Sequence, residues 1–389
     1  MSTDHDLREV LRDVLAGEIT ERLDQAETGV GFDAELWAKL SDLGFTALTA
    51  PEDRGGSGAG WPEAAALLTE SAAAARHLPF AESDLLAHWL LRTAGVPAAD
   101  PTTPLTIALV DPDGTARSVP WLGHVPAVLV IPRPDGTWSV RPPDYARDQP
   151  PENARNQLPE NWSNRVPENW SNRVPENWSN RVPENWSNRV THSGVPRGDL
   201  FGVEAVDGDA VVGDAVVGGE VVDRLVLRAA LARAVQVVGA LDRAVELCVE
   251  HARTRVQFGR PLAKFQAVQH LVADAAAEAA LARAAVDAAV LDAAETDLAG
   301  PASATKVAAA RSCAGHAASV VVRNAHQVHG AIGTTREHPL QLVTLPALDW
   351  RGEFGTTRDW DRFLGRSGPL WDVVLGAPAE HPPIPGGHR

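Results

Sequence analysis

Two long helical patterns separated by a short break constrain the fold of this chain more than any other part of its sequence. The first pattern spans Leu225 to Arg253, and the second spans Phe265 to Thr296. The break contains Gly259-Arg260-Pro261, where glycine favours the end of a helix and proline prevents its continuation. Because so few residues connect the two patterns, we expect a helical hairpin whose first helix ends at this Gly-Arg-Pro segment.

The same break carries side chains suited to binding a nucleotide. Arg253, Arg255, Gln257 and Phe258 all precede the Gly-Arg-Pro segment. A guanidinium group pairs with phosphate oxygens, and it can also stack with an aromatic ring. The sequence therefore predicts an anion site at the turn of the helical hairpin.

The rest of the second half is also helical in pattern. A third helix is predicted from Pro301 to Gly330, and a shorter one near Arg358 to Leu364. Their high alanine content implies closely spaced helix axes, as in a four-helix bundle. Residues 223–389 are thus predicted to form a C-terminal α-helical bundle with a tail.

The first half divides into two further parts. Residues 1–98 predict an α-helical N-terminal domain, and residues 99–222 predict a small β domain, so the fold class is mostly α. The predicted N-terminal helices are Asp6–Ala26, Phe32–Leu43, Pro62–Ala75 and Phe80–Ala94. The predicted strands are Leu105–Val110, Ala127–Ile131 and Thr137–Val140, with strand alternation again from Phe201 to Val222.

A tandem repeat at residues 151–190 interrupts the β domain. The octad Pro-Glu-Asn-Trp-Ser-Asn-Arg-Val begins at Pro159, Pro167, Pro175 and Pro183 after a degenerate first copy. Proline every eight residues excludes a continuous helix, and Asn, Ser and Glu are common in irregular or disordered segments. The repeat is predicted to be an irregular surface insertion; the alternative is an interaction arm that uses its tryptophans as anchors.

Composition excludes several classes of function. A net charge of −16 argues against a nucleic-acid partner, which requires a basic face. No apolar run reaches the roughly 20 residues that span a bilayer, and the acidic N-terminus lacks a signal-peptide pattern, so we expect a cytoplasmic protein without membrane contact. Cys248 and Cys313 are expected to be buried free thiols. His326 and His329 have no carboxylate or cysteine at metal-ligand spacing, so no metal site is predicted.

Three ordered blocks resemble the acyl-CoA dehydrogenase family, and in particular actinobacterial-type subunits of heteromeric steroid side-chain acyl-CoA dehydrogenases. They are the Arg-x-Gln-Phe-Gly-x-Pro element from Arg255 to Pro261, the Gln-x-His-Gly element from Gln327 to Gly333, and the N-terminal run from Phe32 to Gly58. The resemblance implies the order α domain, β domain, α bundle. It also implies FAD as cofactor and an acyl-CoA thioester as substrate.

The resemblance assigns cofactor-binding roles to five residues. In the family, FAD lies at a subunit interface, and these two C-terminal elements hold its adenosine diphosphate end. By position, Arg255 would pair with the pyrophosphate, and Phe258 would pack near the adenosine. Gln327, Val328 and Gly330 would bring amide and backbone groups to the same end. The alternative is that Arg255 and Phe258 only cap and staple the helix turn.

The other half of the resembled site is altered. The family holds the flavin ring with a Gly-Ser-Asp segment in the β domain, whereas the corresponding stretch from Val110 to Ser118 lacks it. The resemblance makes Glu353, in Glu353-Phe354-Gly355-Thr356, the candidate catalytic base, although a phenylalanine is inserted into the family's Glu-Gly-Thr turn. The alternative for Glu353 is a surface glutamate that caps the last helix.

Three functions follow from this pattern. The first is a partner subunit that donates the adenosine-side half of a shared FAD site to a homologous dehydrogenase subunit. The second is a self-sufficient homo-oligomeric acyl-CoA dehydrogenase with Glu353 as base. The third is a scaffold without catalysis. In the first two, the family's electron acceptor, an electron-transferring flavoprotein, is an expected partner.

Overall fold

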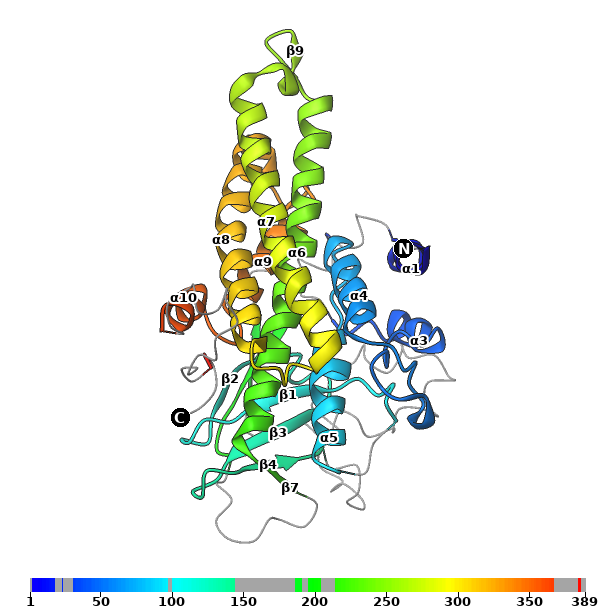
Figure 1. Cartoon of the computed structure of the whole chain (residues 1–389). Helices are drawn as coiled ribbons and strands as arrows, with labels where there is room; N and C mark the ends of the chain where they lie inside the picture. The colour runs from blue at the N-terminus through cyan, green and yellow to red at the C-terminus, as the bar shows by residue number, and fades with distance from the viewer. Residues whose placement is uncertain are drawn as a thin grey trace.

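The protein combines N-terminal helices, a small β region and a long helical bundle (Figure 1). A computed structural model describes residues 2–17, 23, 31–96, 100–143, 186–190, 195–203, 214–366 and 384–385. The predicted fold class, mostly α with a small β domain between two helical parts, is confirmed. Within these residues, no helix combines the length and hydrophobicity needed to cross a membrane.

The N-terminal helices surround a core that includes Trp37, Leu40 and Leu68. Asp33 caps one of them by accepting a hydrogen bond from the Leu36 amide at 2.9 Å. The elements are α1 (Ser2–Leu15), α3 (Ala34–Asp42), η1 (Glu52–Arg54), α4 (Trp61–Ala73), the π-helix η2 (Ala81–His88) and α5 (Trp89–Thr93). The predicted helix Asp6–Ala26 is interrupted: α1 ends at Leu15, residues 16–17 are not helical, and Leu23 is helical again.

The β region consists of two small sheets with the orders β1-β3-β4-β7 and β2-β6-β5. The strands are β1 (Thr106–Leu109), β2 (Ala116–Pro120), β3 (Ala127–Pro132), β4 (Trp138–Arg141), β5 (Trp186–Val190), β6 (Pro196–Leu200) and β7 (Ala215–Val217). β1 pairs with β3 in parallel, and the other pairs are antiparallel. Sequence alone missed β2, whose exposed Arg117 breaks the apolar pattern, and β6, which precedes the predicted strand stretch. Within the stretch Phe201–Val222, β7 is present, but residues 201–203 are not strand and α6 already begins at Gly219.

One strand lies inside the tandem repeat. β5 is the end of the last octad copy, and it pairs with β6 along its full length, from Trp186 opposite Leu200 to Val190 opposite Pro196. The prediction of an irregular insertion is therefore wrong for these five residues. Seven residues separate successive prolines of the repeat, which is enough for a short strand. The rest of the repeat, residues 151–185, lies outside the described residues.

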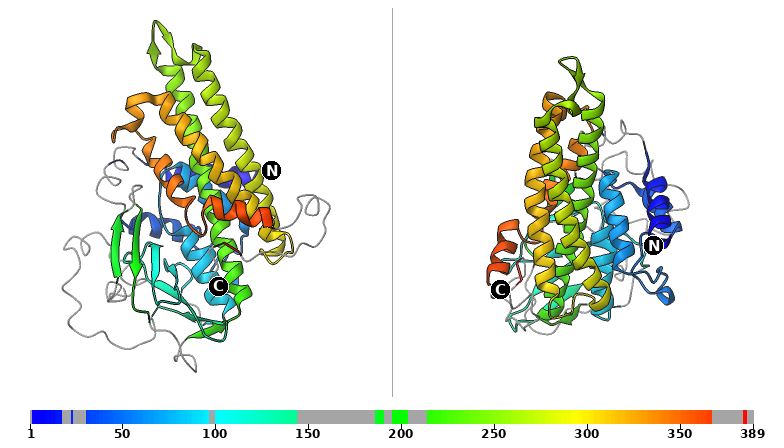
Figure 2. Two further views of the ribbon diagram at one scale, coloured as in Figure 1. Left: turned by 90° about the vertical axis from the view of Figure 1, so that its left-hand side faces the viewer. Right: turned by 45° about the horizontal axis from the view of Figure 1, so that its top comes forward.

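Three long helices lie side by side in the bundle, and a shorter one packs on α6 (Figures 1 and 2). They are α6 (Gly219–Thr254), α7 (Gln266–Thr296), α8 (Ser303–His329) and α9 (Gln341–Trp350), followed by α10 (Thr357–Arg366). Close packing depends on small residues: a Cβ atom at Gly239 on α6 would lie 2.6 Å from the Thr69 carbonyl oxygen on α4. Both cysteines are free; Cys248 is buried, whereas Cys313 is only half-buried.

The connection between α6 and α7 differs from the prediction. Helix α6 ends at Thr254, and the chain then forms a β-hairpin from β8 (Val256–Gln257) and β9 (Arg260–Pro261), followed by η5 (Leu262–Lys264). Phe258 and Gly259 form its two-residue turn with φ values of +51° and +78°. Two positive φ values are typical of a type I′ turn. Gly259 therefore serves a hairpin turn and is not a helix cap.

Candidate functional site

The β8–β9 hairpin lies at the far end of the bundle (Figure 1). The Phe258 ring in its turn and the Arg255 guanidinium group just before β8 are both exposed to solvent. Phe258 at the tip of the hairpin is 91% exposed. With the Gln257 amide oriented to satisfy both side chains, its oxygen accepts from Arg255 Nη2 at 3.0 Å. In the described part of the chain, no ion pair involves Arg255. The guanidinium group therefore keeps its charge available for an anion.

Other cations surround this hairpin in an otherwise acidic protein. Arg253, Arg260 and Lys264 are all exposed within a few residues of the turn. The Arg260 guanidinium carbon lies 4.2 Å from the ring centroid of Phe265, which fixes that side chain beside the hairpin. A local cluster of positive charge on a chain of net charge −16 attracts an anionic ligand.

The end of α8 lies against the last turns of α6, so the two resembled elements meet at the same end of the bundle (Figure 2). The rings of His251 on α6 and His329 on α8 are 4.5 Å apart between centroids. Gln327 and Gly330 are exposed, whereas the Val328 side chain is buried in the core. Gly330 has φ 62° and ψ −142°, a conformation that glycine adopts far more readily than other residues.

Glu353 lies elsewhere, in a buried cluster of charges. Its Oε2 accepts from Arg233 Nε at 2.7 Å, and its Oε1 accepts from Arg197 Nη2. Arg233 also donates to Glu82, and its Nη1 donates to Gln236 Oε1 at 2.6 Å. Arg233 on α6 is separated from the hairpin by roughly 30 Å of helix. The structure thus brings the five candidate cofactor residues to one end of the bundle and does not bring Glu353 there.

The cluster joins all three parts of the chain. Glu82 belongs to η2, Arg197 to β6, Arg233 to α6, and Glu353 to the segment between α9 and α10. None of these four residues is more than 9% exposed. Burial alone raises the pKa of the Glu353 carboxyl, but the charges of Arg233 and then Arg197 outweigh it and hold the pKa below its ordinary value. Glu353 is therefore a buried, ionised and paired carboxylate, not a surface cap.

A further arginine fixes the turn that carries Glu353. Arg311 on α8 donates through Nη2 to the carbonyl oxygens of Glu353 at 2.7 Å and Gly355 at 2.8 Å, and through Nη1 to that of Trp350 at 3.2 Å. Burial lowers the pKa of Arg311 to about 10. Bound in this way to carbonyl dipoles, Arg311 holds the Glu353 backbone against the bundle.

Little open space adjoins the Glu353 carboxylate. The cavity bounded by Glu82, Arg233 and Glu353 has a volume of about 10 Å³, with Trp121 and Trp350 among its other walls. That volume corresponds to about one water molecule. No acyl chain fits beside Glu353 in this arrangement.

The stretch that corresponds to the family's flavin-ring segment is also occupied by internal contacts. The Ser118 amide donates to Asp199 Oδ1 at 2.7 Å, and the Ser118 hydroxyl accepts from Arg197 Nη1 at 3.3 Å. These groups are already satisfied within the β region. This geometry does not fit a flavin ring held at Ser118, whereas the exposed Arg255, Phe258 and Gly330 fit the adenosine diphosphate end.

Sequence reasoning missed two buried arginines of α6. Arg228 and Arg233 stand within an apolar stretch of α6, and both are only 2% exposed. Arginine is almost never fully buried without a partner, so this spacing could have predicted buried ion pairs. Arg228 pairs with Asp297 and lies 4.5 Å from the Trp89 ring centroid.

Comparison with known proteins matches the chain to a protein family and to individual curated proteins. The acyl-CoA dehydrogenase N-terminal domain matches residues 2–99, and the acyl-CoA dehydrogenase C-terminal domain matches residues 218–355. Acyl-CoA dehydrogenase IpdE2 of Mycolicibacterium smegmatis is 39% identical over 114 residues, or 29% of this chain and 34% of that protein. IpdE2 of Mycobacterium tuberculosis is 35% identical over 119 residues. The chain thus spans about a third of the length of these curated relatives.

Solved structures share the fold over almost the whole chain. The ChsE4-ChsE5 complex from Mycobacterium tuberculosis gives a TM-score of 0.74 at 22% identity, covering 95% of this chain and 99% of that chain. A variant of the Tcur3481-Tcur3483 steroid ACAD gives 0.73 at 22% identity, covering 96% and 98%. At such identity the likeness concerns the fold alone. The two domain matches cover more than half of the sequence, and the chain belongs to the acyl-CoA dehydrogenase family.

Proposed function

We propose that this chain is the partner subunit of a heteromeric FAD-dependent acyl-CoA dehydrogenase and donates the adenosine-side half of a shared FAD site. The complex would catalyse α,β-dehydrogenation of an acyl-CoA thioester. The observation that carries this proposal is the contrast between the exposed Arg255 and Phe258 and the fully paired Glu353. The adenosine-side half, with Arg255 and Phe258, is open to a ligand. The half that contains Glu353 is filled by the chain's own side chains.

The open half has groups for each portion of an adenosine diphosphate. Arg255 presents a fork of donors that matches pyrophosphate oxygens. Phe258 presents a ring for the adenosine, and burying it beneath a ligand would remove a large apolar surface from water. The exposed Gln327 amide and the Gly330 backbone lie near the end of α8, where Gly330 allows close approach. Val328 contributes only through its backbone, because its side chain is buried.

The partner supplies the catalytic base in this proposal. A general base needs an accessible oxygen within hydrogen-bond reach of the proton that it removes. Both oxygens of Glu353 accept from buried arginines, and their ionic contacts oppose proton uptake. Glu353 would serve as base, as the self-sufficient enzyme requires, only after leaving both Arg197 and Arg233. Bound FAD would supply the hydride acceptor, with an electron-transferring flavoprotein as the expected electron acceptor.

An exposed apolar face of α7 also supports the proposal of a homologous partner subunit. Ala277, Leu281, Ala284, Ala288 and Leu291 are all exposed on α7, and their spacing alternates between four and three residues. Leu281 and Leu291 are 58% and 62% exposed. This spacing forms one stripe that suits helix–helix packing, and small residues allow a close approach. Such an apolar face is typical of a surface that another chain covers.

Flavin absorbance tests the proposal directly. The chain is purified alone and after co-expression with a homologous dehydrogenase that has an intact flavin segment and an unambiguous base. We expect a colourless chain alone and a yellow complex with the partner. Arg255→Gln should reduce FAD retention in that complex, whereas Arg362→Gln, at an exposed position of α10, is the matched control. One FAD per chain without a partner, together with inactivation by Glu353→Gln, would instead establish the self-sufficient enzyme. Failure to bind FAD in either form would favour the scaffold.

A further inference from the structure

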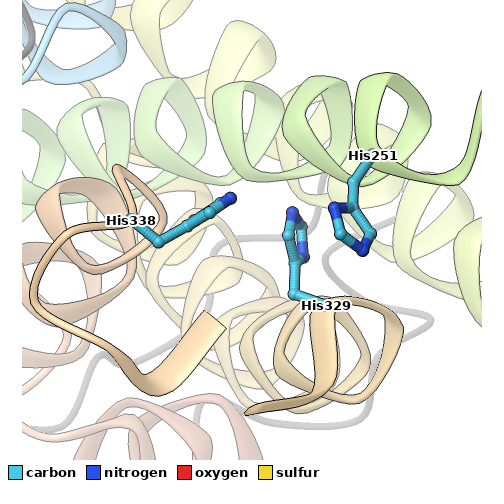
Figure 3. Close-up of side chains that lie close together, drawn as sticks. All are labelled: His251, His329 and His338. Carbon is cyan, nitrogen blue, oxygen red and sulfur yellow. The ribbon is translucent and has the colours of Figure 1, made fainter. Parts of the chain in front are cut away.

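Three histidines from separate elements converge beside the candidate cofactor site (Figure 3). His251 lies in the last turn of α6, His329 is the last residue of α8, and His338 lies between η6 (Gly330–Thr334) and α9. The ring centroid of His329 lies 4.5 Å from that of His251 and 4.7 Å from that of His338. One ring nitrogen from each residue lies within 4.8 Å of the others.

The hydrogen bonding of His329 leaves Nε2 as the ring nitrogen available to a metal ion. Its Nδ1 lies 2.8 Å from the Ala325 carbonyl oxygen, so the proton of the neutral ring is on Nδ1. Its Nε2 is buried and, within the described residues, makes no hydrogen bond of normal geometry, although the Leu247 backbone lies close enough to the ring to act toward raising its pKa. His329 itself is only 5% exposed. A carbonyl that orients an imidazole through its second nitrogen is the usual support for a metal ligand.

All three rings favour the neutral form that binds metal. Burial, followed by the neighbouring histidines, lowers the pKa of His338 to about 4. Burial is also the largest cause that lowers the pKa of His329 and of His251. Packing three imidazoles together is unfavourable when they are protonated. A shared cation would instead satisfy their lone pairs.

We propose that His251, His329 and His338 bind one divalent transition-metal ion, with Zn²⁺ as the best match. Three imidazole nitrogens with a fourth position for water or an outside ligand form a known tetrahedral zinc arrangement. The described residues offer no carboxylate or thiol to this group. A purely nitrogen donor set disfavours Mg²⁺ and Ca²⁺, which prefer oxygen. This site goes beyond the proposed FAD function and does not depend on it.

Metal binding would change the loop before α9. His338 Nδ1 now accepts from the Leu340 amide at 3.1 Å, so the proton of its neutral ring is on Nε2. Binding through Nδ1 displaces that amide, and binding through Nε2 requires the proton to move to Nδ1. Either route breaks the His338–Leu340 hydrogen bond. The metal would therefore connect α6, the end of α8 and this loop, and would release the Leu340 amide.

Metal titration of the full, tag-free chain after chelator treatment tests this site. We expect calorimetry to give about one Zn²⁺ per chain, and Co²⁺ to give the intense visible absorption of a tetrahedral complex. His329→Gln should weaken Zn²⁺ binding by at least about 100-fold, more than the loss of an outer-shell group. His316→Gln is the matched control, because His316 lies on the same helix but is exposed and pairs with Asp361.

Two additional variants keep the test decisive if His329→Gln fails to fold. His251→Gln and His338→Gln change half-buried positions, and both should abolish the rise in melting temperature that Zn²⁺ gives the unaltered chain. Hydrogen exchange at the Leu340 amide should accelerate when Zn²⁺ binds. The proposal is overturned if the unaltered chain does not bind Zn²⁺, or if His251→Gln and His338→Gln bind it as tightly as the unaltered chain does.

Discussion

Helix α6 and the hairpin segment that follows it use arginine in two different ways. In the first half of α6, Arg233 is 2% exposed and is paired with Glu82 and Glu353. Just after its last residue, Arg255 is exposed, and its only described side-chain contact is the neutral Gln257 amide. Arg233 forms its ion pairs within the chain, whereas the charge of Arg255 remains available to a ligand. The same residue type thus joins domains at one place and presents charge at another.

This difference bears on which half of a shared site the chain can provide. A buried carboxylate held by two guanidinium groups has lost the freedom that a base requires. An exposed guanidinium beside an exposed ring on a two-residue turn is poorly explained by stability alone, because each gains little from the folded chain. The region around Arg233 and Glu353 is therefore structural, whereas the region around Arg255 and Phe258 is suited to binding a ligand. Four predictions test this distinction.

The largest effect is expected at Arg233. Arg233→Met keeps the length of the side chain but leaves the buried Glu82 and Glu353 without their shared cation. Removing one partner from a buried ionic cluster typically destabilises a protein strongly, and we expect a loss of about 5 kcal/mol. Urea unfolding of the full chain measures this change. Arg243→Met, at a half-exposed pair on the same helix, is the control and should cost less than about 1 kcal/mol.

Glu353 gives the next largest effect, and its pH dependence has a defined sign. Its folded-state pKa is below the ordinary value of 4.5, so it stabilises the fold fully above that pH. This contribution is lost as pH falls through the lower folded-state pKa. At neutral pH, Glu353→Gln should destabilise the chain by about 3 kcal/mol.

The pH profile provides the internal check on Glu353. The stability difference between Glu353→Gln and the unaltered chain should shrink as the pH falls below 4.5, and urea midpoints at several pH values measure it. A difference that stays constant across this range would mean that the ionised carboxylate is not what stabilises the cluster.

A tenfold effect is expected from the conservative change Arg255→Lys. Lysine keeps the charge but loses the planar fork of donors, so FAD affinity of the heteromeric complex should fall by about 10-fold. Equilibrium dialysis with FAD measures the affinity, and Arg362→Lys is the control. Because Arg255 is exposed, the free energy of unfolding should not change. Equal FAD affinity in the two variants would exclude a bidentate role for Arg255.

The sequence predicted the bundle well because its signals are local. Alanine content and apolar spacing gave the long helices, but Gly259 is compatible with both a helix cap and a type I′ turn. Nothing local distinguished these alternatives, so the hairpin was missed. The Glu353 cluster joins side chains 120 and 156 residues apart, and no spacing rule relates them. The histidine cluster was missed for the same reason, because His251 lies on a different helix from His329.

The smallest effect tests whether function explains Phe258. A phenylalanine with φ +51° occupies backbone conformation that asparagine adopts more easily, and Asn-Gly is the preferred pair in a type I′ turn. Phe258→Asn should therefore stabilise the chain by about 0.5 to 1 kcal/mol. The same change removes the exposed ring, so it should weaken FAD binding in the complex. Opposite signs in urea unfolding and FAD dialysis would identify Phe258 as a residue kept for its ligand at the expense of the turn. If both measurements improve, or if FAD affinity is unchanged, the ring has no part in the adenosine-side half-site, and Arg255 would have to act without it.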